Sequence, residues 1–175
     1  FKRNFIGDKS VLAVRDHDGA VNVFLNRCAH HGSTITRDWL GNSASLMCPY
    51  HQWTYNLKGK LTGVPFRRGV NGLGGMPDDF KLEEHALHDL KVAVVNGAIF
   101  ASFDENVPDF ADYLGSDMMS LFSRVFDGRP LRIVGYQRQL IGSNWKLMME
   151  NIKDPYHASL LHVFLLSFGL FRIDV

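Results

Sequence analysis

The sequence predicts an α+β protein, with an antiparallel β domain followed by the start of a second, more helical domain. Short β-branched and apolar runs separated by turn residues fill roughly the first hundred positions, a pattern typical of antiparallel hairpins. Beyond residue 103 helix-forming residues become frequent and turn signals become rarer. We therefore expect a first domain over residues 1–103 and the truncated start of an α+β domain over residues 104–175.

Three pairs of runs predict the hairpins of the first domain. They are 10–15 with 20–25, 53–57 with 60–64, and 91–95 with 98–103. The turns between them contain Asp-Gly, Lys-Gly and Asn-Gly, which favour tight hairpin connections. The glycine-rich stretch 63–75 lacks the strand–loop–helix order of a phosphate-binding loop, so we expect an irregular loop there. His17, His85 and His88 are expected at the surface.

The second part of the chain predicts helices over 109–114, 116–126 and 144–151, with a strand over 131–141. The 175 residues are 46% hydrophobic and 21% charged, with a formal net charge of +1. A charge so near zero, without a block of Lys or Arg, argues against a nucleic acid or a membrane surface as partner. No apolar run approaches the roughly 20 residues of a membrane-spanning helix. A cytoplasmic protein is expected.

Two short motifs contain both cysteines of the chain, and each cysteine is followed closely by a histidine. They read Cys28-Ala29-His30 and Cys48-Pro49-Tyr50-His51. A Rieske [2Fe–2S] cluster needs this mixture, because two Cys hold one iron and two His hold the other. We assign Cys28 and Cys48 to one iron and His30 and His51 to the other. Both loops are expected at the tips of hairpins.

A structural zinc site with two Cys and two His is the alternative, since zinc accepts the same side chains. Zinc knuckles usually pair Cys with Cys and His with His, whereas each motif here mixes the two. Tyr50, Gln52 and Trp53 also surround the second motif, and an aromatic wall would keep water from a redox centre. With both cysteines used as ligands, none is left for a disulfide, which fits a reducing compartment.

A second candidate site contains His157 and His162, two potential ligands of a 2-His-1-carboxylate iron site. On an ideal helix, residues five apart lie about 140° from one another around the axis. Both rings can therefore reach one metal only if the helix ends or bulges between them. Without further evidence, two His at this spacing are more often ordinary helix residues than ligands.

Together these motifs resemble the large (α) subunit of bacterial Rieske non-haem iron aromatic-ring-hydroxylating oxygenases. The first motif continues with His31, where that family usually carries Arg. The pattern Asp154-x2-His157-x4-His162 resembles the family's mononuclear iron motif. The run Asn-x-Lys-Asp-Pro-Tyr-His, residues 151–157, is similar to members that act on carboxylated aromatics, such as salicylate 5-hydroxylase, anthranilate dioxygenase and terephthalate dioxygenase.

The resemblance implies roles for further residues. Asp154 would be a bridging carboxylate that accepts hydrogen bonds from His157 and from His51 of a neighbouring subunit. Tyr50 and Asn151 would support the catalytic site. The family's carboxylate iron ligand would lie outside this chain, because Asp174 is too close to the histidine pair. The chain begins with Phe1 rather than Met, and we expect a fragment.

The implied activity is hydroxylation of an aromatic ring, as a mono- or dioxygenase, with O2 and a carboxylated aromatic substrate. Electrons would come from NAD(P)H through a reductase, with or without a ferredoxin, and pass by the Rieske cluster to mononuclear Fe(II). The resemblance also implies an α3 or α3β3 oligomer in the bacterial cytoplasm.

Two other classes of protein compete with this interpretation. A free-standing Rieske ferredoxin would only carry electrons, but it should end near residue 103 and has no use for His157 and His162. A zinc-stabilised interaction module would explain the Cys and His motifs but not the second site. A visible spectrum separates zinc, which is colourless, from the red-brown Rieske cluster, and mononuclear iron then separates the oxygenase from the ferredoxin.

Overall fold

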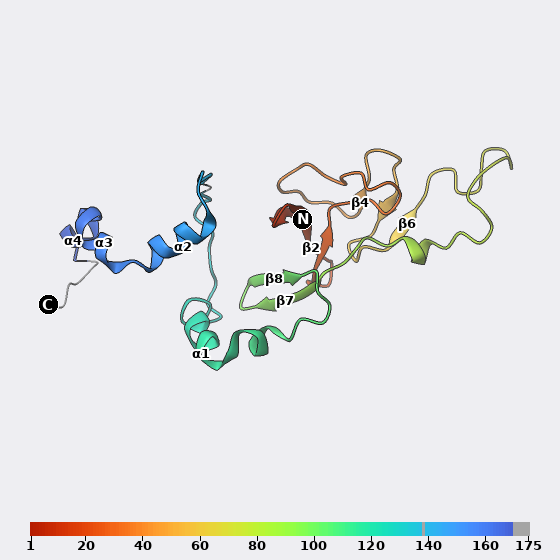
Figure 1. The fold of residues 1–175 in the computed structure, drawn as a ribbon. Helices are drawn as coiled ribbons and strands as arrows, with labels where there is room; N and C mark the ends of the chain where they lie inside the picture. The colour runs from red at the N-terminus through yellow and green to blue at the C-terminus, as the bar shows by residue number, and fades with distance from the viewer. Residues whose placement is uncertain (138, 170–175) are drawn as a thin grey trace. The chain divides into compact units, whose positions relative to one another are not determined.

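The computed structural model describes residues 1–137 and 139–169, which belong to two compact units, Phe1–Leu131 and Arg132–Val175 (Figure 1). The first unit contains three small antiparallel sheets and one long helix. The described part of the second unit contains short helices. The expected order, β structure first and helices later, is therefore confirmed.

The first sheet has the strand order β1 (Lys2–Ile6), β2 (Lys9–Arg15) and β3 (Val21–Leu25). Strands β2 and β3 form the predicted 10–15/20–25 hairpin, whereas β1 was not expected from the sequence. The connecting turn leaves His17 exposed, as predicted.

The second sheet consists of β4 (Leu46–Met47), β5 (Thr54–Tyr55) and β6 (Leu61–Gly63), and the predicted 53–57/60–64 hairpin is its second half. Gly59 in the intervening turn has a φ of +77°, and a Cβ there would lie 2.5 Å from the Phe24 ring. Only glycine meets both demands without strain. Its carbonyl accepts a hydrogen bond from the amide of Leu87, which follows the short 3-10 helix Leu82–His85.

The third predicted hairpin is present as β7 (Lys91–Val95) and β8 (Ala98–Ser102). Asn96 and Gly97 at its turn have φ angles of 49° and 89°, and a tight turn with two positive φ angles suits the twist of a hairpin. The amide of Leu90 donates to the carbonyl of Val23, which fastens this hairpin to the first sheet.

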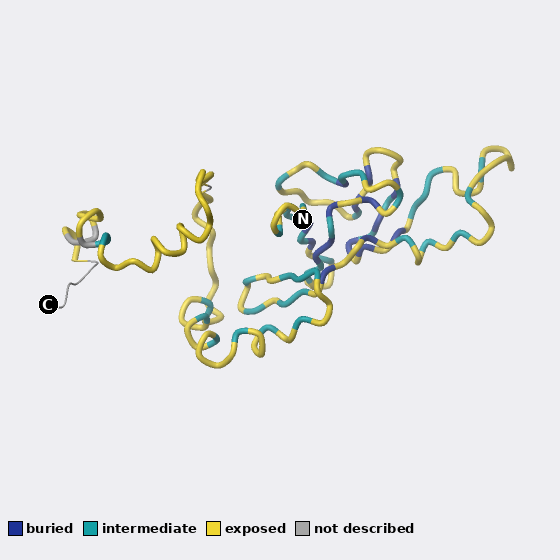
Figure 2. Tube along the Cα trace, viewed as in Figure 1, coloured by how far each residue is buried: buried dark blue, intermediate teal, exposed yellow. Residues whose placement is uncertain are grey.

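One buried cluster joins the first two sheets and contains both cysteines (Figure 2). Its members are Leu12, Val14, Phe24, Cys28, Ile35, Leu46, Cys48, Trp53, Tyr55, Leu57, Leu61 and Leu87. By contrast, no described residue of the second unit is buried. The cysteine motifs thus lie against the best-packed part of the chain.

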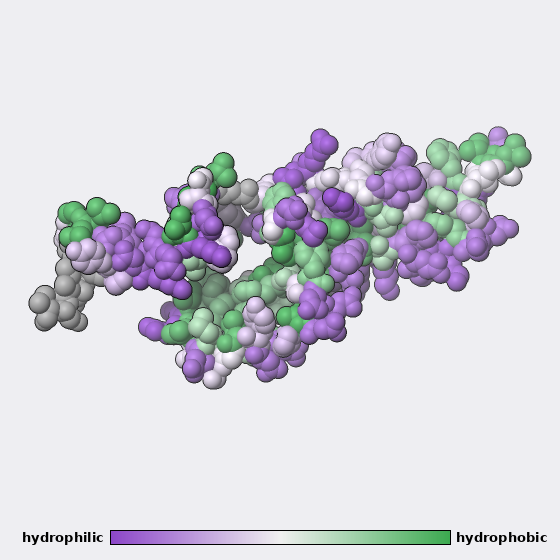
Figure 3. All heavy atoms as spheres, viewed as in Figure 1, coloured by the Kyte–Doolittle hydropathy of each residue, from purple (hydrophilic) through white to green (hydrophobic). Residues whose placement is uncertain are grey.

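The glycine-rich stretch after β6 is an irregular loop, as predicted. Its end is a small turn in which Val70 and Leu73 exchange backbone hydrogen bonds of 3.0 Å. Phe66, Val70 and Leu73 are exposed there, and Figure 3 shows hydrophobic surface gathered at the end of this loop.

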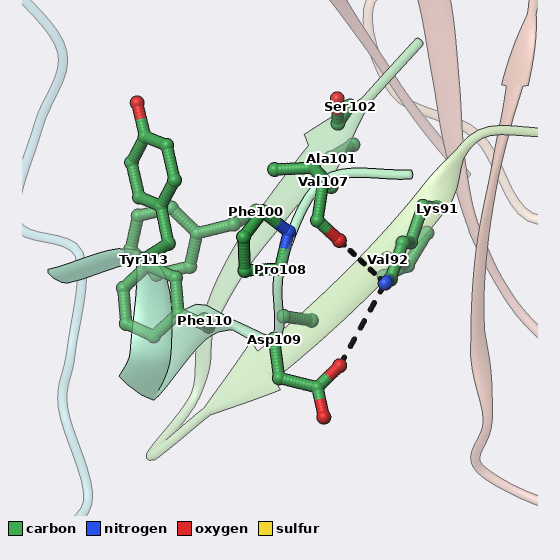
Figure 4. Close-up of a pocket in the computed structure, with 11 residues that line it drawn as sticks. Lys91, Val92, Phe100, Ala101, Ser102, Val107, Pro108, Asp109, Phe110 and Tyr113 are labelled. Carbon is green, nitrogen blue, oxygen red and sulfur yellow. Dashed lines mark hydrogen bonds and ion pairs between the residues drawn. The ribbon is translucent and has the colours of Figure 1, made fainter. Parts of the chain in front are cut away.

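Helix α1 (Phe110–Val125) covers both helices predicted over 109–114 and 116–126. Gly115 interrupts it with φ 73° and ψ 168°, so the two predicted pieces are the two halves of a kinked helix. Before α1, the ammonium group of Lys91 donates to the carbonyl of Val107 at 2.7 Å and lies 3.7 Å from Asp109 (Figure 4). The cavity of about 290 Å³ beside them is lined by neither the cysteines nor the histidines of the predicted cluster.

The second unit contains α2 (Trp145–Lys153), α3 (Pro155–Leu161) and α4 (Val163–Ser167). Helix α2 confirms the predicted helix 144–151, and the Asn144 side chain caps it by accepting from the amide of Lys146. The strand predicted over 131–141 was wrong for the described positions 131–137 and 139–141. These residues are exposed, and no described strand pairs with them to supply ladder hydrogen bonds. Among the described helices, none combines the length and apolar character that crossing a membrane requires.

Candidate metal centre

The two cysteine motifs fold into loops with the same backbone hydrogen bonds. In each loop the cysteine amide donates to the carbonyl five residues later, and the amide four residues later donates back to the cysteine carbonyl. The cysteine amides donate to the carbonyls of Ser33 and Trp53, respectively, both at 2.8 Å. The cysteine carbonyls accept from the amides of Gly32 and Gln52, both at 2.9 Å. The two loops therefore share one pattern of backbone hydrogen bonds, and each carries one Cys and one His.

The second loop departs from the first at one backbone position. Gly32 and Gln52 both have positive φ angles, 70° and 58°. Glycine adopts this conformation freely, whereas a residue with a Cβ is strained in it. The loop around Cys48 therefore carries a small conformational cost that the loop around Cys28 does not.

The predicted position at hairpin tips is correct for one loop and wrong for the other. The second loop joins β4 to β5, which pair with each other. The first loop leaves β3 in one sheet and leads to β4 in another, so it connects two sheets instead of closing a hairpin. The sequence shows where strands end, but pairing partners depend on contacts between distant residues.

The side chains of the four predicted cluster ligands lie together. Cys28 and Cys48 are 4% and 1% exposed, and both are free thiols. The rings of His30 and His51 lie 4.8 Å apart in an edge-to-face arrangement. The Nδ1 atom of His30 is buried and has no hydrogen-bond partner among the described residues. A buried nitrogen without a partner is costly unless a metal or another group completes it.

The surroundings of Cys28 and His30 shift the pKa values of both side chains. Burial raises the pKa of the Cys28 thiol and the neighbouring Cys48 adds to this, while bonds from Tyr55 and the His30 amide oppose it. A bound cation would favour the thiolate there. Burial lowers the pKa of His30, and the nearby His31 and His51 lower it further. These effects favour the neutral form of His30, which is the form that binds metals.

Tyr55 supports the first cysteine, and the sequence pattern did not single it out. Its side chain is fully buried, and its hydroxyl lies 3.1 Å from the Sγ of Cys28. The same oxygen accepts a hydrogen bond of 3.1 Å from the amide of Ala29. With that bond made, the hydroxyl proton is free to point at the sulfur. Its place in β5, two residues after Trp53, is the only signal in the sequence.

Asn26 organises the first loop from inside the core. It is 1% exposed, and its side-chain amide donates to the carbonyl of Thr36 at 2.8 Å and to Ser10 Oγ at 3.1 Å. The side-chain oxygen of Asn26, Oδ1, accepts hydrogen bonds from the backbone amides of Ile35 and Thr36, both at 3.2 Å. This buried residue, also missed from the sequence, ties both ends of the loop that contains Cys28.

Tyr50 and His31 lie on the exposed side of the histidine pair. The Tyr50 ring is 3.8 Å from the His51 ring and is 65% exposed. The His31 ring is 3.9 Å from that of His30 and 5.7 Å from that of His51. His51 is exposed as well, so one side of the candidate centre faces solvent in this unit.

Within the described part of the chain, no three His, Cys, Asp or Glu side chains converge on one metal ion. A binuclear cluster does not require this, because each iron takes only two protein ligands and the sulfides complete the rest. The arrangement of two buried thiols and two imidazoles fits a Rieske cluster in this respect.

In the second candidate site, the helix ends between His157 and His162, as is required if both rings are to reach one metal. Helix α3 ends at Leu161, and His162 follows with non-helical φ and ψ of −101° and 59°. The rings of His157 and His162 consequently lie only 5.3 Å apart. Asn151, the other predicted residue of this site, is exposed at the end of α2. Asp174 lies outside the described residues.

Asp154 has two functions in this segment. One carboxylate oxygen caps α3 by accepting from the amide of Tyr156 at 2.8 Å. The other lies 3.1 Å from Nδ1 of His157. These bonds, the first more than the second, hold the pKa of Asp154 below its usual value. A carboxylate at Nδ1 leaves Nε2 of His157 available for a metal.

Residues 1–74 match the Rieske [2Fe-2S] domain family. The chain carries a Rieske [2Fe–2S] domain. Within that match lie all four predicted ligands, Cys28, His30, Cys48 and His51.

Curated relatives extend the similarity beyond the Rieske domain. The chain is 57% identical to the large oxygenase component of salicylate 5-hydroxylase from Ralstonia sp, over 99% of this chain and 42% of the relative. It is 47% identical to the large subunit of anthranilate 1,2-dioxygenase from Burkholderia cepacia, over 100% and 41%. The chain thus spans about two fifths of the length of these relatives. The predicted resemblance to large subunits of Rieske oxygenases is confirmed.

Solved structures support the fold. Naphthalene 1,2-dioxygenase from Rhodococcus sp. superposes with a TM-score of 0.83 at 32% identity, covering 99% of this chain and 39% of that one. A quaternary ammonium Rieske monooxygenase superposes with a TM-score of 0.82 at 23% identity, covering 99% and 47%, which speaks for the fold alone. The predicted fold class is confirmed. The domain boundary at residue 103 stays a prediction, because the family match ends at 74 and the compact unit at 131.

Proposed function

We propose that this chain belongs to the terminal oxygenase component of an aromatic ring-hydroxylating system. The main observation in support is that two buried cysteines and two neighbouring histidines lie in equivalent loops of the Rieske domain. A second histidine pair beside Asp154 extends the proposal from electron transfer to oxygenation. The relatives with 57% and 47% identity are oxygenase large subunits, in agreement with this function.

In the first site, Cys28 and Cys48 would hold one iron and His30 and His51 the other. A bound Rieske cluster supplies one-electron transfer at a potential raised by its neutral histidine ligands. The protein contributes a dry pocket on the cysteine side, where Tyr55 and Asn26 fix the loop. On the histidine side it leaves His51 exposed, where an electron partner can approach.

In the second site, His157 and His162 would be two ligands of a mononuclear iron, with a carboxylate outside this chain as the third. An iron bound by these residues would supply the activation of O2. Asp154 orients His157 through Nδ1, and the end of α3 brings His162 beside it. Asn151 and Tyr50 are proposed as supporting residues, on the strength of the motif alone.

Asp154 is also proposed to bridge the two sites between subunits. Its carboxylate would accept from His157 of its own chain and from His51 of a neighbouring one, within an α3 or α3β3 assembly. Head-to-tail contacts of this kind close into rings. The proposed electron source is NAD(P)H through a reductase, with or without a ferredoxin, in the bacterial cytoplasm.

The proposed substrate class is a carboxylated aromatic ring. This proposal is supported by the relatives, whose names include salicylate, anthranilate and, at 46% identity, terephthalate 1,2-dioxygenase of Comamonas sp. The proposed domains are residues 1–103 for the cluster and 104–175 for the beginning of the catalytic domain.

The deciding experiment supplies the full-length protein with its reductase, NADH, O2 and each of these three aromatic acids in turn. We expect a hydroxylated ring product formed in step with NADH consumption, and no product from a His157→Ala variant that still carries the cluster. Reduction of the cluster without any product from the full-length protein would favour a Rieske ferredoxin-type electron carrier and contradict the oxygenase.

A further inference from the structure

Trp53 stacks on His30, one of the two proposed histidine ligands. The ring centroids lie 4.5 Å apart and the planes differ by 10°. Trp53 is 3% exposed, so the contact is formed within the core. Parallel rings at this distance make a favourable contact, and the stacked neighbour limits rotation of the imidazole about its own side-chain bond.

Two further rings hold Trp53 from its edge. Phe80 lies 5.9 Å from it at 76°, and His85 lies 5.6 Å from it at 75°. These two rings also pack on each other at 4.5 Å. Both are half-buried, and Nδ1 of His85 is hydrogen-bonded to the carbonyl of Lys81 at 2.9 Å. The support comes from residues 80–85, a segment outside both ligand loops.

Among the described residues, no buried aromatic ring stacks on the other proposed histidine ligand, His51. His51 is exposed, and the aromatic ring next to it, Tyr50, is 65% exposed. His30, in contrast, is half-buried, and its unpartnered Nδ1 is buried. The two histidines therefore differ in how firmly the protein fixes them.

We propose that Trp53, Phe80 and His85 form an aromatic brace that positions His30 as a cluster ligand. The brace fixes the plane of the imidazole before the cluster binds, so that less rotational freedom is lost on ligation. His51 is left freer, as suits the ligand nearest a partner. The inference rests on the proposed cluster and adds residues 80–85 to the segments that determine its properties.

The test compares cluster-loaded full-length variants by pulse EPR of the reduced cluster and by the rate at which a chelator bleaches its visible absorption. Trp53→Leu should broaden the coupling of one of the two ligand nitrogens and speed cluster loss by about 3- to 10-fold, the range expected for one stacked contact. Trp53→Phe should restore most of the wild-type behaviour, because a ring is retained.

Phe80→Leu and His85→Leu retain a side chain of similar size but remove one ring contact with Trp53 each, so each should cause a smaller change in the same direction. His88→Leu is the matched control, because His88 lies only three residues after His85 but is exposed and contacts the Phe103 ring instead. If the Trp53→Leu variant does not assemble the cluster, the Phe80 and His85 variants test whether the brace positions His30. Unchanged nitrogen couplings and loss rates in the assembled variants would overturn the brace. Wild-type protein without nitrogen couplings would instead overturn the cluster assignment itself.

Discussion

The hydroxyl of Tyr55 lies 3.1 Å from the Sγ of Cys28, and both side chains are buried. Burial raises the pKa of Tyr55, and the neighbouring cysteine sulfur raises it further. The raised pKa favours the protonated phenol, which can donate its hydrogen to a Cys28 thiolate. Hydrogen bonds to the sulfurs are one of the factors that determine the potential of an iron–sulfur cluster.

Replacing Tyr55 with Phe should lower the reduction potential of the cluster. The reduced form carries more negative charge, so it gains more from a donor at Cys28 than the oxidised form does. We expect a decrease on the order of 50 mV, close to a tenfold change in a one-electron equilibrium. Protein-film voltammetry measures it, with Tyr113→Phe as the control because that residue is exposed. A potential equal to wild type in Tyr55→Phe would show that the hydroxyl has no such effect.

Asn26→Ala should destabilise the Rieske domain and reduce cluster loading. It leaves the buried amide of Ile35 and the half-buried amide of Thr36 without their acceptor, and the loss of a buried partner costs about 1–3 kcal/mol, with less for a half-buried one. We expect the free energy of unfolding, measured with denaturant, to decrease by about 2–4 kcal/mol. Asn22→Ala is the matched control, since Asn22 makes a single half-buried bond to the carbonyl of Leu57 and should cost about 1 kcal/mol. Equal losses for the two variants would contradict the role of Asn26.

Gln52→Gly should stabilise the second loop. Gln52 has a φ of 58°, whereas the equivalent position of the first loop is glycine. Glycine relieves this strain, but it also makes the unfolded chain more flexible, which opposes the gain. The net increase in the free energy of unfolding should be about 0.5–1 kcal/mol. Thermal unfolding of the cluster-loaded chain measures the gain, and Gln52→Ala separates loss of the side chain from relief of the backbone. A glycine variant no more stable than the alanine variant would argue against strain.

Local sequence patterns were sufficient to predict the three hairpins and helices α1 and α2, and they single out the four side chains that we propose as cluster ligands. Turn pairs such as Asn96-Gly97 and spacings such as Cys48-x2-His51 are local, so they can be recognised without knowing the fold. Asn26 and Tyr55 could not be recognised in this way. Their importance comes from partners at other positions, such as Thr36 for Asn26 and Cys28 for Tyr55.

The errors have the same physical origin. The stretch 131–141 has strand-forming residues, but a strand also needs a neighbour, and no described strand pairs with it. The first ligand loop joins two sheets instead of closing a hairpin, because β3 pairs with β2 and not with β4. For His157 and His162, the sequence predicted only that the helix must end or bulge between them if both are to bind one metal. Helix α3 does end at Leu161.

Asp154→Asn in the full-length enzyme should leave the cluster spectrum intact and slow electron transfer from cluster to iron. Asparagine still caps α3, but it lacks the charge that supports the imidazole of His157. We expect single-turnover oxidation of the cluster, with substrate and O2, to slow by about 10- to 100-fold. Asp154→Ala, which also loses the cap, should additionally reduce helicity. Wild-type rates in Asp154→Asn with both metals bound would remove Asp154 from the electron route.

The central claim is that Cys28, Cys48, His30 and His51 hold a mixed-ligand [2Fe–2S] cluster. Pulse EPR of the reduced, iron-loaded chain tests it most directly, because nitrogen ligands couple to the unpaired electron. We predict couplings from two histidine nitrogens in the wild type and from only one in His51→Cys, whose added thiolate should also lower the potential. A colourless zinc protein, or a cluster without nitrogen couplings, would contradict the assignment.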